Sequence, residues 1–435
     1  MKHKPEAILI VNGRLIDPSQ QTDGPHDLLL RDGKVAEIGV PGSLNSHHAH
    51  KIDARGCVVA PGLIDIHVHL RAPGQEYKED IHSGTSAAVA GGFTSVCAMP
   101  NTVPVNDSPE WTRWMQEPAR EALAHVFPIA AATIGSQGGA LTDYAALQHA
   151  GAVAVTDDGK PILGDDIMRK SLEAAGRLGL PVIQHAENTC ATGGCSMNSG
   201  PTSFRLGLRG MSVEAESDIV ERDIRLARET GAHLHVAHIS TAKALDAVRR
   251  AKNAGLRVTC EVTPHHFLLL DEHVGEYDTH HKMNPPLRSN ADREAMLAGL
   301  LDGSLDCVAT DHAPHAMHEK KQEFERAPMG ITGLETSLGL CLRELHEKHG
   351  MSLSKVIALL STTPAKVIGG PLKSKGSLKP GSVADVTIFD PSTKWNFDVK
   401  RSRSKSRNSP FDGSPMLGQV EYTIVGGAIV YQSLK

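Results

Sequence analysis

The stretch Pro61-Gly-Leu-Ile-Asp-Ile-His-Val-His-Leu-Arg71 decides the fold that we predict for this chain. Leu63 to His67 is typical of a buried strand, because it is apolar and repeats a branched isoleucine. His67 and His69 stand two positions apart, and residues i and i+2 of a strand point to the same face. Two imidazoles on one face can share a metal ion, and Arg71 adds a positive charge at the next position on that side. Taken alone, the pair fits core histidines equally well, so the rest of the chain has to decide.

Short apolar runs alternate with helical patterns between about residues 61 and 370, which indicates βα repetition and a parallel sheet. The runs are 63–70, 95–99, 126–131, 152–155, 181–184, 234–237, 257–262 and 307–309. Helical patterns such as 166–178, 213–230 and 242–254 fall between most of them. Eight such units predict an α/β fold of the (β/α)8 TIM-barrel type, in which functional groups lie at the C-terminal ends of the strands.

Both ends of the chain carry strand patterns instead. Asn12-Gly13 and Asp32-Gly33 each lie between apolar runs, which is a hairpin signal, and Gly426-Gly427 has the same position near the C-terminus. We therefore expect three parts. Residues 1–60 and 371–435 form the two halves of one small β-sandwich, and residues 61–370 form the barrel.

Composition limits the classes of partner. A net charge of -5 gives no reason to expect nucleic acid or an anionic membrane surface. The seven cysteines include no Cys-x-x-Cys pair, which indicates reduced thiols and a cytoplasmic location. The first residues lack the apolar run of a signal peptide, and no stretch of 18 apolar residues could span a membrane. We expect a cytoplasmic protein that acts on a small molecule.

Side chains that can bind metals or substrates come directly after most of the apolar runs. They are His67, His69 and Arg71; Asn101; Asp157 and Asp158; His185; His238; His265, His266 and Asn284; and Asp311, His312 and His315. Burying such groups without partners is unfavourable, whereas one shared open rim accounts for them together. Six of these residues form the expected metal-binding set, namely His67, His69, His185, His238, Asp158 and Asp311, whereas His265 and His266 are expected to be structural. Four imidazoles and two carboxylates are too many for a single catalytic zinc with three protein ligands. They suit two metal ions that share a carboxylate and activate a water to attack a carbonyl.

Five segments together resemble the dihydroorotases of the bacterial class I kind, in the amidohydrolase superfamily. They are His67-Val-His-Leu-Arg71, Met99-Pro-Asn-Thr102, Thr156-Asp-Asp-Gly159, Asn284-Pro-Pro-Leu-Arg288 and Asp311-His-Ala-Pro-His315. The likeness covers nearly the whole chain. It implies the reversible cyclisation of N-carbamoyl-L-aspartate to (S)-dihydroorotate in de novo pyrimidine biosynthesis, through a bridging hydroxide activated by two Zn²⁺ ions per subunit.

The resemblance also implies roles for individual residues. His67 and His69 hold one zinc with help from Asp311, His185 and His238 hold the second, and Asp158 bridges them. Asp311 is also the general acid and base. The implied substrate contacts are Arg71, Asn101, Asn284, His315, Met329 and Gly330. Asp158 is preferred to Asp157 for its spacing to His185, and a carboxylated Lys160 stays open as another bridge.

Two other functions remain open. One is another cyclic amidase, a dihydropyrimidinase or an allantoinase, which uses the same metals on a different ring. Asp158 with Arg71 and Asn101 favours a carboxylate-bearing substrate instead. The other is an inactive, metal-free scaffold for aspartate transcarbamoylase, although no metal ligand is missing here. The oligomeric state and a complex with aspartate transcarbamoylase also stay open.

Overall fold

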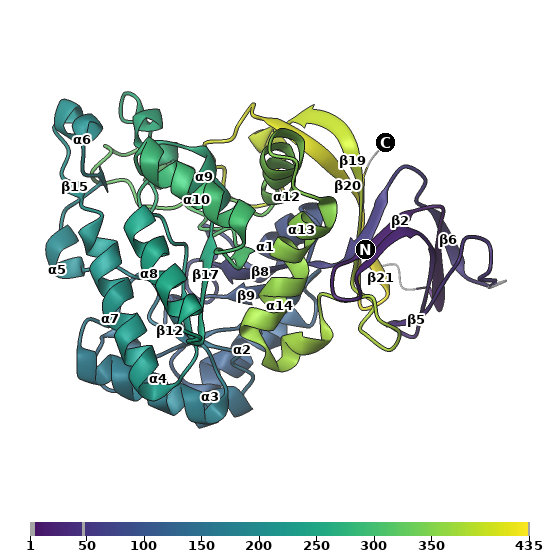
Figure 1. The fold of residues 1–435 in the computed structure, drawn as a ribbon, viewed down its shortest axis with the longest axis horizontal. Coiled ribbons are helices and arrows are strands. Elements are labelled where there is room, and N and C mark those ends of the chain that lie inside the picture. The colour runs from purple at the N-terminus through teal and green to yellow at the C-terminus, as the bar shows by residue number, and fades with distance from the viewer. Residues whose placement is uncertain (1–4, 46–47, 434–435) are drawn as a thin grey trace.

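The computed structural model describes residues 5–45 and 48–433 (Figure 1). The first four residues, on which part of the signal-peptide expectation depends, lie outside that range. Among the described residues, no helix combines the length and the apolar character needed to cross a bilayer.

The middle of the chain forms two parallel sheets whose strands alternate with helices. One sheet has the order β10-β9-β8, with β8 (Leu63–Val68), β9 (Phe93–Ala98) and β10 (His125–Pro128). The other has the order β11-β12-β13-β16-β17-β18, with β11 (Ala130–Ala131), β12 (Val155–Thr156), β13 (Val182–Gln184), β16 (Leu234–Val236), β17 (Val258–Val262) and β18 (Cys307–Val308). Each strand overlaps one of the predicted apolar runs, so the prediction of an α/β fold with parallel strands is confirmed.

Backbone contacts link the two parallel sheets at both ends. Only Ile129 separates β10 from β11, and its N–H donates to the carbonyl of Ala98 at 2.9 Å. At the other end, Val68 forms a parallel bridge with His312, and the N–H of His69 donates to the carbonyl of His312 at 2.8 Å. The segment directly after β18 is therefore hydrogen-bonded to β8, the first strand of the set.

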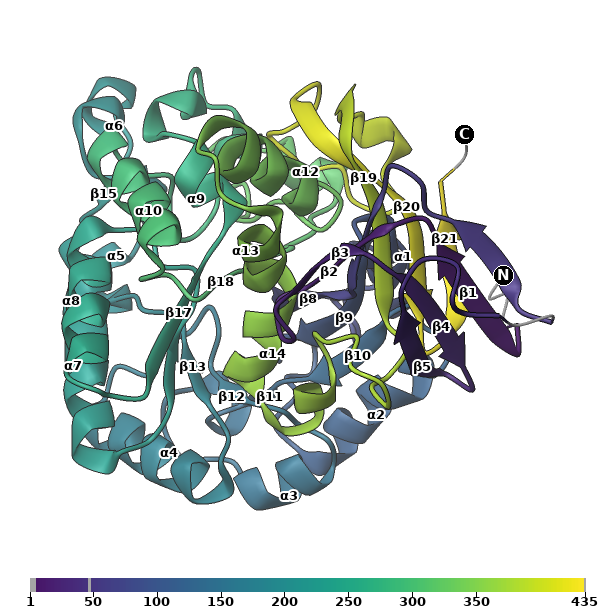
Figure 2. The ribbon, with the colours of Figure 1, turned by 45° about the vertical axis from the view of Figure 1, so that its right-hand side comes forward.

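Helices surround these strands (Figures 1 and 2). They are α1 (Ile81–Ala90), α2 (Pro109–Ala119), α3 (Tyr144–His149), α4 (Asp165–Leu178), α5 (Thr189–Thr192), α6 (Pro201–Leu206), α7 (Glu214–Thr230), α8 (Ala242–Asn253), α9 (Pro264–Leu268), α10 (Asn290–Asp302), α11 (Met317–Lys320), α12 (Ser337–Cys341), α13 (Leu353–Ile357) and α14 (Thr363–Ile368). Two short strands, β14 (Met197–Asn198) and β15 (Gly210–Met211), pair between α5 and α7. The three helices predicted by residue range match α4, α7 and α8 to within one residue.

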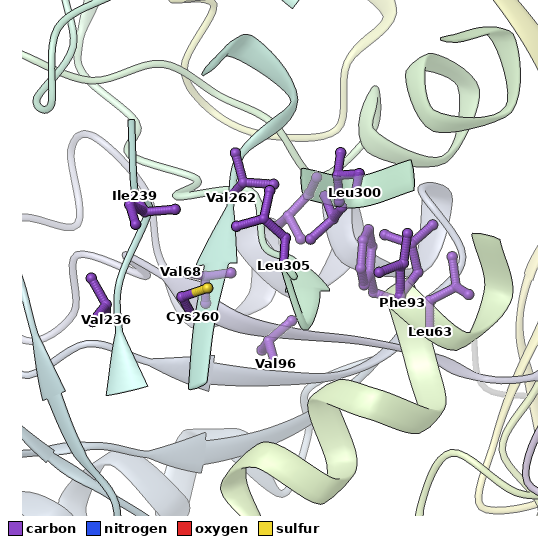
Figure 3. Packing of buried hydrophobic residues seen from close by; sticks show 14 of the residues in the cluster. Leu63, Val68, Phe93, Val96, Val236, Ile239, Cys260, Val262, Leu300 and Leu305 are labelled. Carbon is purple, nitrogen blue, oxygen red and sulfur yellow. The ribbon is translucent and has the colours of Figure 1, made fainter. Parts of the chain in front are cut away.

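Apolar side chains from strands and helices form the largest buried cluster, part of which is drawn in Figure 3. Leu63 and Phe93 come from neighbouring parallel strands, and both are fully buried. Val262 on β17 lies in the same cluster as Leu300 on α10. This packing fixes the strand ends, and with them the side chains that come after each strand.

Strands from both chain ends meet in a third region (Figure 2). A six-stranded sheet has the order β21-β20-β19-β7-β2-β3, with β2 (Arg14–Asp17), β3 (Thr22–Pro25), β7 (Val58–Pro61), β19 (Val386–Asn396), β20 (Pro415–Val425) and β21 (Ala428–Gln432). A four-stranded sheet has the order β5-β4-β1-β6, with β1 (Ala7–Val11), β4 (Asp27–Arg31), β5 (Lys34–Gly39) and β6 (His50–Asp53). One buried cluster joins them, with Ile10 and Leu28 from the smaller sheet and Val59, Val386 and Ile424 from the larger.

Two of the three hairpin predictions are confirmed and one is wrong. Asp32-Gly33 connects β4 to β5, and Gly426-Gly427 connects β20 to β21. Asn12-Gly13 does not make a hairpin, because β1 and β2 belong to different sheets. A Cβ on Gly13 would lie 2.6 Å from Cγ2 of Val59, so this glycine instead allows the chain to pass closely over β7 as it changes sheets.

Candidate active site

Six side chains of metal-ligand type lie at the C-terminal ends of the parallel strands. His67 is on β8 and His69 is just beyond its end; Asp158, His185, His238 and Asp311 come after β12, β13, β16 and β18. None of the six is more than 7% exposed. Residues far apart in the chain therefore share one buried polar region, as the sequence predicts.

Asp158 lies at the centre of this group. Its carboxylate oxygens are 3.5 Å from Nε2 of His67 and 3.6 Å from Nε2 of His69. They are also 3.7 Å from Nδ1 of His185 and 3.9 Å from Nε2 of His238. Burial alone would raise the pKa of Asp158, but the neighbouring histidines, His67 first, hold it well below its usual value. Asp158 is therefore an anion placed between two pairs of imidazoles.

Asp311 contacts the first of these pairs. Its Oδ1 lies 3.0 Å from Nε2 of His69 and 3.6 Å from Nε2 of His67. The backbone at Asp311 has a φ of +47°, and Arg71 and His238 have φ values of +59° and +27°. Non-glycine residues seldom adopt this left-handed conformation, which costs free energy and persists only where the surrounding fold holds it. Three of the residues predicted for the site are held in this way.

The group fits metal ions by an independent criterion. Nε2 of His67, the ring nitrogen that faces Asp158, is buried and has no hydrogen-bond partner, an arrangement that is unfavourable without a ligand. Two sets of three residues, His67-His69-Asp158 and Asp158-His185-His238, each offer ligand atoms within 4.8 Å of one another. Imidazole nitrogens and carboxylate oxygens are common ligands of catalytic metals. The two sets share Asp158, so the donors suit two neighbouring ions.

The histidines are oriented by groups behind them. Nδ1 of His67 lies 2.7 Å from Oε1 of Glu261, and Nδ1 of His69 lies 2.8 Å from Oδ1 of Asn101. The other oxygen of Glu261 contacts Nε2 of His235 at 3.2 Å. An acceptor at Nδ1 fixes the tautomer that leaves Nε2 free to bind a metal. Sequence reasoning missed Glu261; the only signal was one acidic residue inside the apolar run 257–262.

Arg71 and His315 lie together beside this region. Nη2 of Arg71 is 3.3 Å from Nε2 of His315, and Nε of Arg71 donates to the carbonyl of Pro314 at 3.1 Å. His315 also contacts the carbonyl of Met329 at 2.8 Å, next to Gly330. Burial and the charge of Arg71 lower the pKa of His315 to about 2, so this imidazole is neutral. The fixed charge of the pair therefore comes from the arginine.

Asn284 is tied to the second histidine pair. Its Nδ2 donates to Oε2 of Glu187 at 2.7 Å and lies 3.2 Å from Nε2 of His185. Glu187 itself contacts His185 at 3.0 Å. Burial alone would raise the pKa of Glu187, but this contact outweighs it and the pKa falls to about 2. The sequence places Glu187 after the fifth run, yet its contact with His185 was not predicted.

The remaining candidates lie elsewhere. Asp157 accepts the backbone N–H of Thr133 at 3.0 Å, and Lys160 is exposed. His266 is held between Thr263 and the carbonyl of Pro285, at 2.7 and 3.0 Å. Of the three residues considered for the bridge, Asp157, Asp158 and Lys160, the one that lies among the four histidines is Asp158.

Comparisons with known proteins find relatives over nearly the whole chain. A family model described as "Dihydro-orotase-like" matches residues 56–244, and one described as "Amidohydrolase family" matches residues 212–431. A dihydroorotase of Citrifermentans bemidjiense is 49% identical over 427 residues, which is 98% of this chain and 100% of that protein. A dihydroorotase of Solibacter usitatus is 48% identical and covers 97% of both chains.

Solved structures share the fold over nearly the whole length. An L-hydantoinase (dihydropyrimidinase) from Arthrobacter aurescens has a TM-score of 0.87 at 24% identity, covering 98% of this chain and 96% of its own. A dihydropyrimidinase from Brevibacillus agri has a TM-score of 0.84 at 25% identity, covering 98% and 95%.

Proposed function

This chain belongs to the dihydroorotase-like amidohydrolases, and we propose that it is a class I dihydroorotase of the bacterial kind with two zinc ions. It is a metal-dependent cyclic amide hydrolase that interconverts N-carbamoyl-L-aspartate and (S)-dihydroorotate. In the ring-closing direction of pyrimidine biosynthesis it forms one amide bond and releases one water. The observation that carries the proposal is the convergence of four histidines on Asp158, in a chain 49% identical over its full length to a dihydroorotase.

The ligand assignment is based on the two sets of donors. His67, His69 and Asp311 would hold one ion, His185 and His238 the other, and Asp158 would contact both. When bound, two zinc ions supply a water-derived nucleophile at neutral pH and polarise the carbonyl that it attacks. The carboxylate of Asp158 also offsets part of the positive charge that the ions bring into a buried site.

Asp311 would move the proton. In the ring-opening direction its carboxylate accepts a proton from the attacking water and returns it to the ring nitrogen that leaves. Burial alone would raise the pKa of Asp311, but hydrogen bonding to His69 and the charges of the histidines lower it strongly. Asp311 would thus act as the base in one step and as the acid in the next, the two roles of a single proton-transfer group.

The substrate carboxylate would lie between Arg71, Asn101 and His315. A guanidinium can hold a carboxylate through two parallel hydrogen bonds, and its planar shape sets the orientation of the ring. Asn284 and the backbone of Met329 and Gly330 would contact the remaining polar edge of the ring. This carboxylate recognition separates the proposal from a dihydropyrimidinase or allantoinase, whose rings carry no such group.

We also propose that the parallel strands close into a (β/α)8 barrel and that the two antiparallel regions form one sandwich. The bridge between Val68 and His312 supports the first, and the shared buried cluster of the two sheets supports the second. The barrel would span residues 61–370, and residues 1–60 and 371–435 would supply the sandwich.

Seven free cysteines support a cytoplasmic location. The mass of the protein in solution would show whether it is a homo-oligomer. The same measurement on a mixture with aspartate transcarbamoylase would show whether the two proteins form a complex.

One experiment tests the function directly. Purified, zinc-loaded protein is given dihydroorotate, dihydrouracil and allantoin in parallel, and loss of each ring is monitored by absorbance. We expect ring opening of dihydroorotate alone, with about two zinc ions per chain by mass spectrometry. Preferred turnover of either other ring would contradict the proposal. Metal-free, inactive protein would favour the scaffold function.

A further inference from the structure

A segment between β19 and β20 reaches from the C-terminal region to the rim of the candidate site. We call residues 402–408 the C-terminal strap. The backbone N–H of Lys405 donates to Oε1 of Glu79 at 3.1 Å, and the hydroxyl of Ser406 donates to the carbonyl of Lys78 at 2.8 Å. The strap ends at Asn408, which is only 2% exposed. A part of the chain remote in sequence thus lies next to the loops that come after β8 and β18.

Asn408 uses its whole side-chain amide to join two of these loops. Its Nδ2 donates to the carbonyls of Ala313 and Gly330, each at 3.0 Å. Its Oδ1 accepts the backbone N–H of His315, also at 3.0 Å. The carbonyl of Asn408 accepts the N–H of Thr332 at 2.9 Å. A buried amide with both donors and its acceptor engaged holds its partners at fixed separations.

The two joined loops are those of the proposed carboxylate clamp. One carries His315, which lies beside Arg71, and the other carries Met329 and Gly330. A Cβ on Gly330 would lie 2.7 Å from Cβ of Ala313, so the loops approach as closely as their backbones allow. A small change in their separation would therefore move the imidazole of His315 relative to the guanidinium of Arg71.

We propose that Asn408 is a positioning residue for substrate, which sets the clamp geometry by tying the His315 loop to the Gly330 loop. The inference rests on the proposed dihydroorotase function and adds a residue outside the barrel segment. Asn408 contacts none of the six candidate metal ligands in the hydrogen bonds of the described residues. Its loss should therefore weaken substrate binding more than it slows the chemical step.

The Gly330 loop has a second support that should keep it folded without Asn408. Nζ of Lys320 donates to the carbonyls of Pro328 and Gly330 at 2.9 and 3.1 Å. Lys320 is 2% exposed, and its ammonium group donates to the carbonyls of Lys282, Pro328 and Gly330, none of which belongs to the His315 loop. The two loops also meet directly, because the N–H of Ala313 donates to the carbonyl of Ile331 at 2.8 Å. Removing Asn408 should therefore shift His315 relative to Met329 and Gly330 without detaching either loop.

The test uses full-length, zinc-loaded protein and the variant Asn408→Asp. Aspartate keeps the acceptor for the N–H of His315 but has no N–H to give the carbonyls of Ala313 and Gly330. We expect KM for dihydroorotate to rise by about tenfold or more while kcat changes by less than about threefold, because misplacement by a fraction of an ångström weakens oriented contacts. Zinc content should match the wild type. Asn408→Ala, which adds no charge, should shift KM in the same direction.

Ser406→Ala is the matched control, because it removes another buried anchor of the same strap that touches neither loop. It should leave KM unchanged. Hydrogen exchange supplies a readout independent of turnover: amides of 313–316 and 329–332 should exchange faster in Asn408→Asp than in Ser406→Ala.

An unchanged KM in both Asn408 variants would overturn the inference, and so would equal KM shifts in Asn408→Asp and Ser406→Ala. If the wild type does not open dihydroorotate while exchange still responds to Asn408→Asp, the proposed function fails and the tie between the loops stands.

Discussion

Replacing Glu261 with glutamine should weaken metal binding although every proposed ligand is kept. Glu261 is 1% exposed and contacts Nδ1 of His67 at 2.7 Å and Nε2 of His235 at 3.2 Å. Burial alone would raise the pKa of Glu261, but these two hydrogen bonds lower it to about 2, so it is a carboxylate that accepts from both rings. Glutamine has the same shape but only one accepting oxygen, so its NH₂ must face one of the two histidines.

The size of the expected loss in zinc affinity depends on that lost hydrogen-bond acceptor. A hydrogen bond to a charged group contributes about 1.5–3 kcal/mol. Losing the one to His67 would free its Nδ1 proton to move to Nε2, the nitrogen proposed to bind metal. We therefore expect Glu261→Gln to weaken zinc binding by about 10- to 100-fold, in the range found for groups that orient metal ligands.

The assay is competition for zinc between the protein and a chromophoric chelator, with the released metal measured by absorbance. Asp385→Asn is the control, since Asp385 is also a buried, hydrogen-bonded carboxylate but belongs to the junction with the C-terminal sheet. Zinc affinity within twofold of wild type in Glu261→Gln would refute the reasoning, as would an equal loss in the control.

Three more changes probe the site and the fold. Asp311→Asn should lower kcat by about 10²- to 10⁴-fold, the usual contribution of a proton-transfer group, with an unaltered circular dichroism spectrum; an unchanged kcat would remove Asp311 from the mechanism. Arg71→Met keeps the buried volume but loses the charge, so KM for dihydroorotate should rise by about 10- to 100-fold, and an unaltered KM would rule out the clamp. The carboxylate of Asp385 accepts a hydrogen bond from Nζ of Lys375 at 2.6 Å and lies 3.1 Å from Nε2 of His125. Burial alone would raise the pKa of Asp385, but these partners lower it, so its stabilisation is present above the ordinary carboxyl pKa and is lost as pH falls through the lowered value. Asp385→Asn should therefore lower the free energy of unfolding by about 3 kcal/mol at pH 7, as measured by urea denaturation. The difference in this free energy between wild type and variant should become smaller as the pH falls, and a difference that does not change with pH would contradict the prediction.

Local patterns were enough to predict the strand ends and the polar side chains just beyond them. His67 and His69 could be assigned to one face because strand geometry alternates strictly, and the eight short apolar runs between helical patterns are typical of covered strands. That His185, His238 and the pair Asp157-Asp158 lie at one rim could then be predicted, because parallel strands end on the same side; the choice of Asp158 over Asp157 came from the resemblance to the dihydroorotases. None of this required contact information.

Contacts made through a strand or across the fold were not predictable in the same way. Glu261 lies in an apolar run, and no local pattern indicates that it faces His67 from another strand. Asn408 lies in a basic, polar segment that is typical of a solvated loop. Its contacts were not predictable because its partners Ala313 and Gly330 are distant in sequence. The hairpin prediction at Asn12-Gly13 was wrong for the opposite reason. The local turn signal is strong, but packing against Val59 decides which sheet the next strand joins.

The interleaving of chain ends in the six-stranded sheet bears on synthesis at the ribosome. β7 pairs with β2 on one side and with β19 on the other, in the register Pro61 to Val386. While the nascent chain is still being translated, β7 has only its early partner, and one edge waits for a strand made near the end. Premature termination would leave that edge open to other chains, a known route to aggregation. Messages that end before the codons for β19 should therefore yield insoluble product rather than a shortened enzyme.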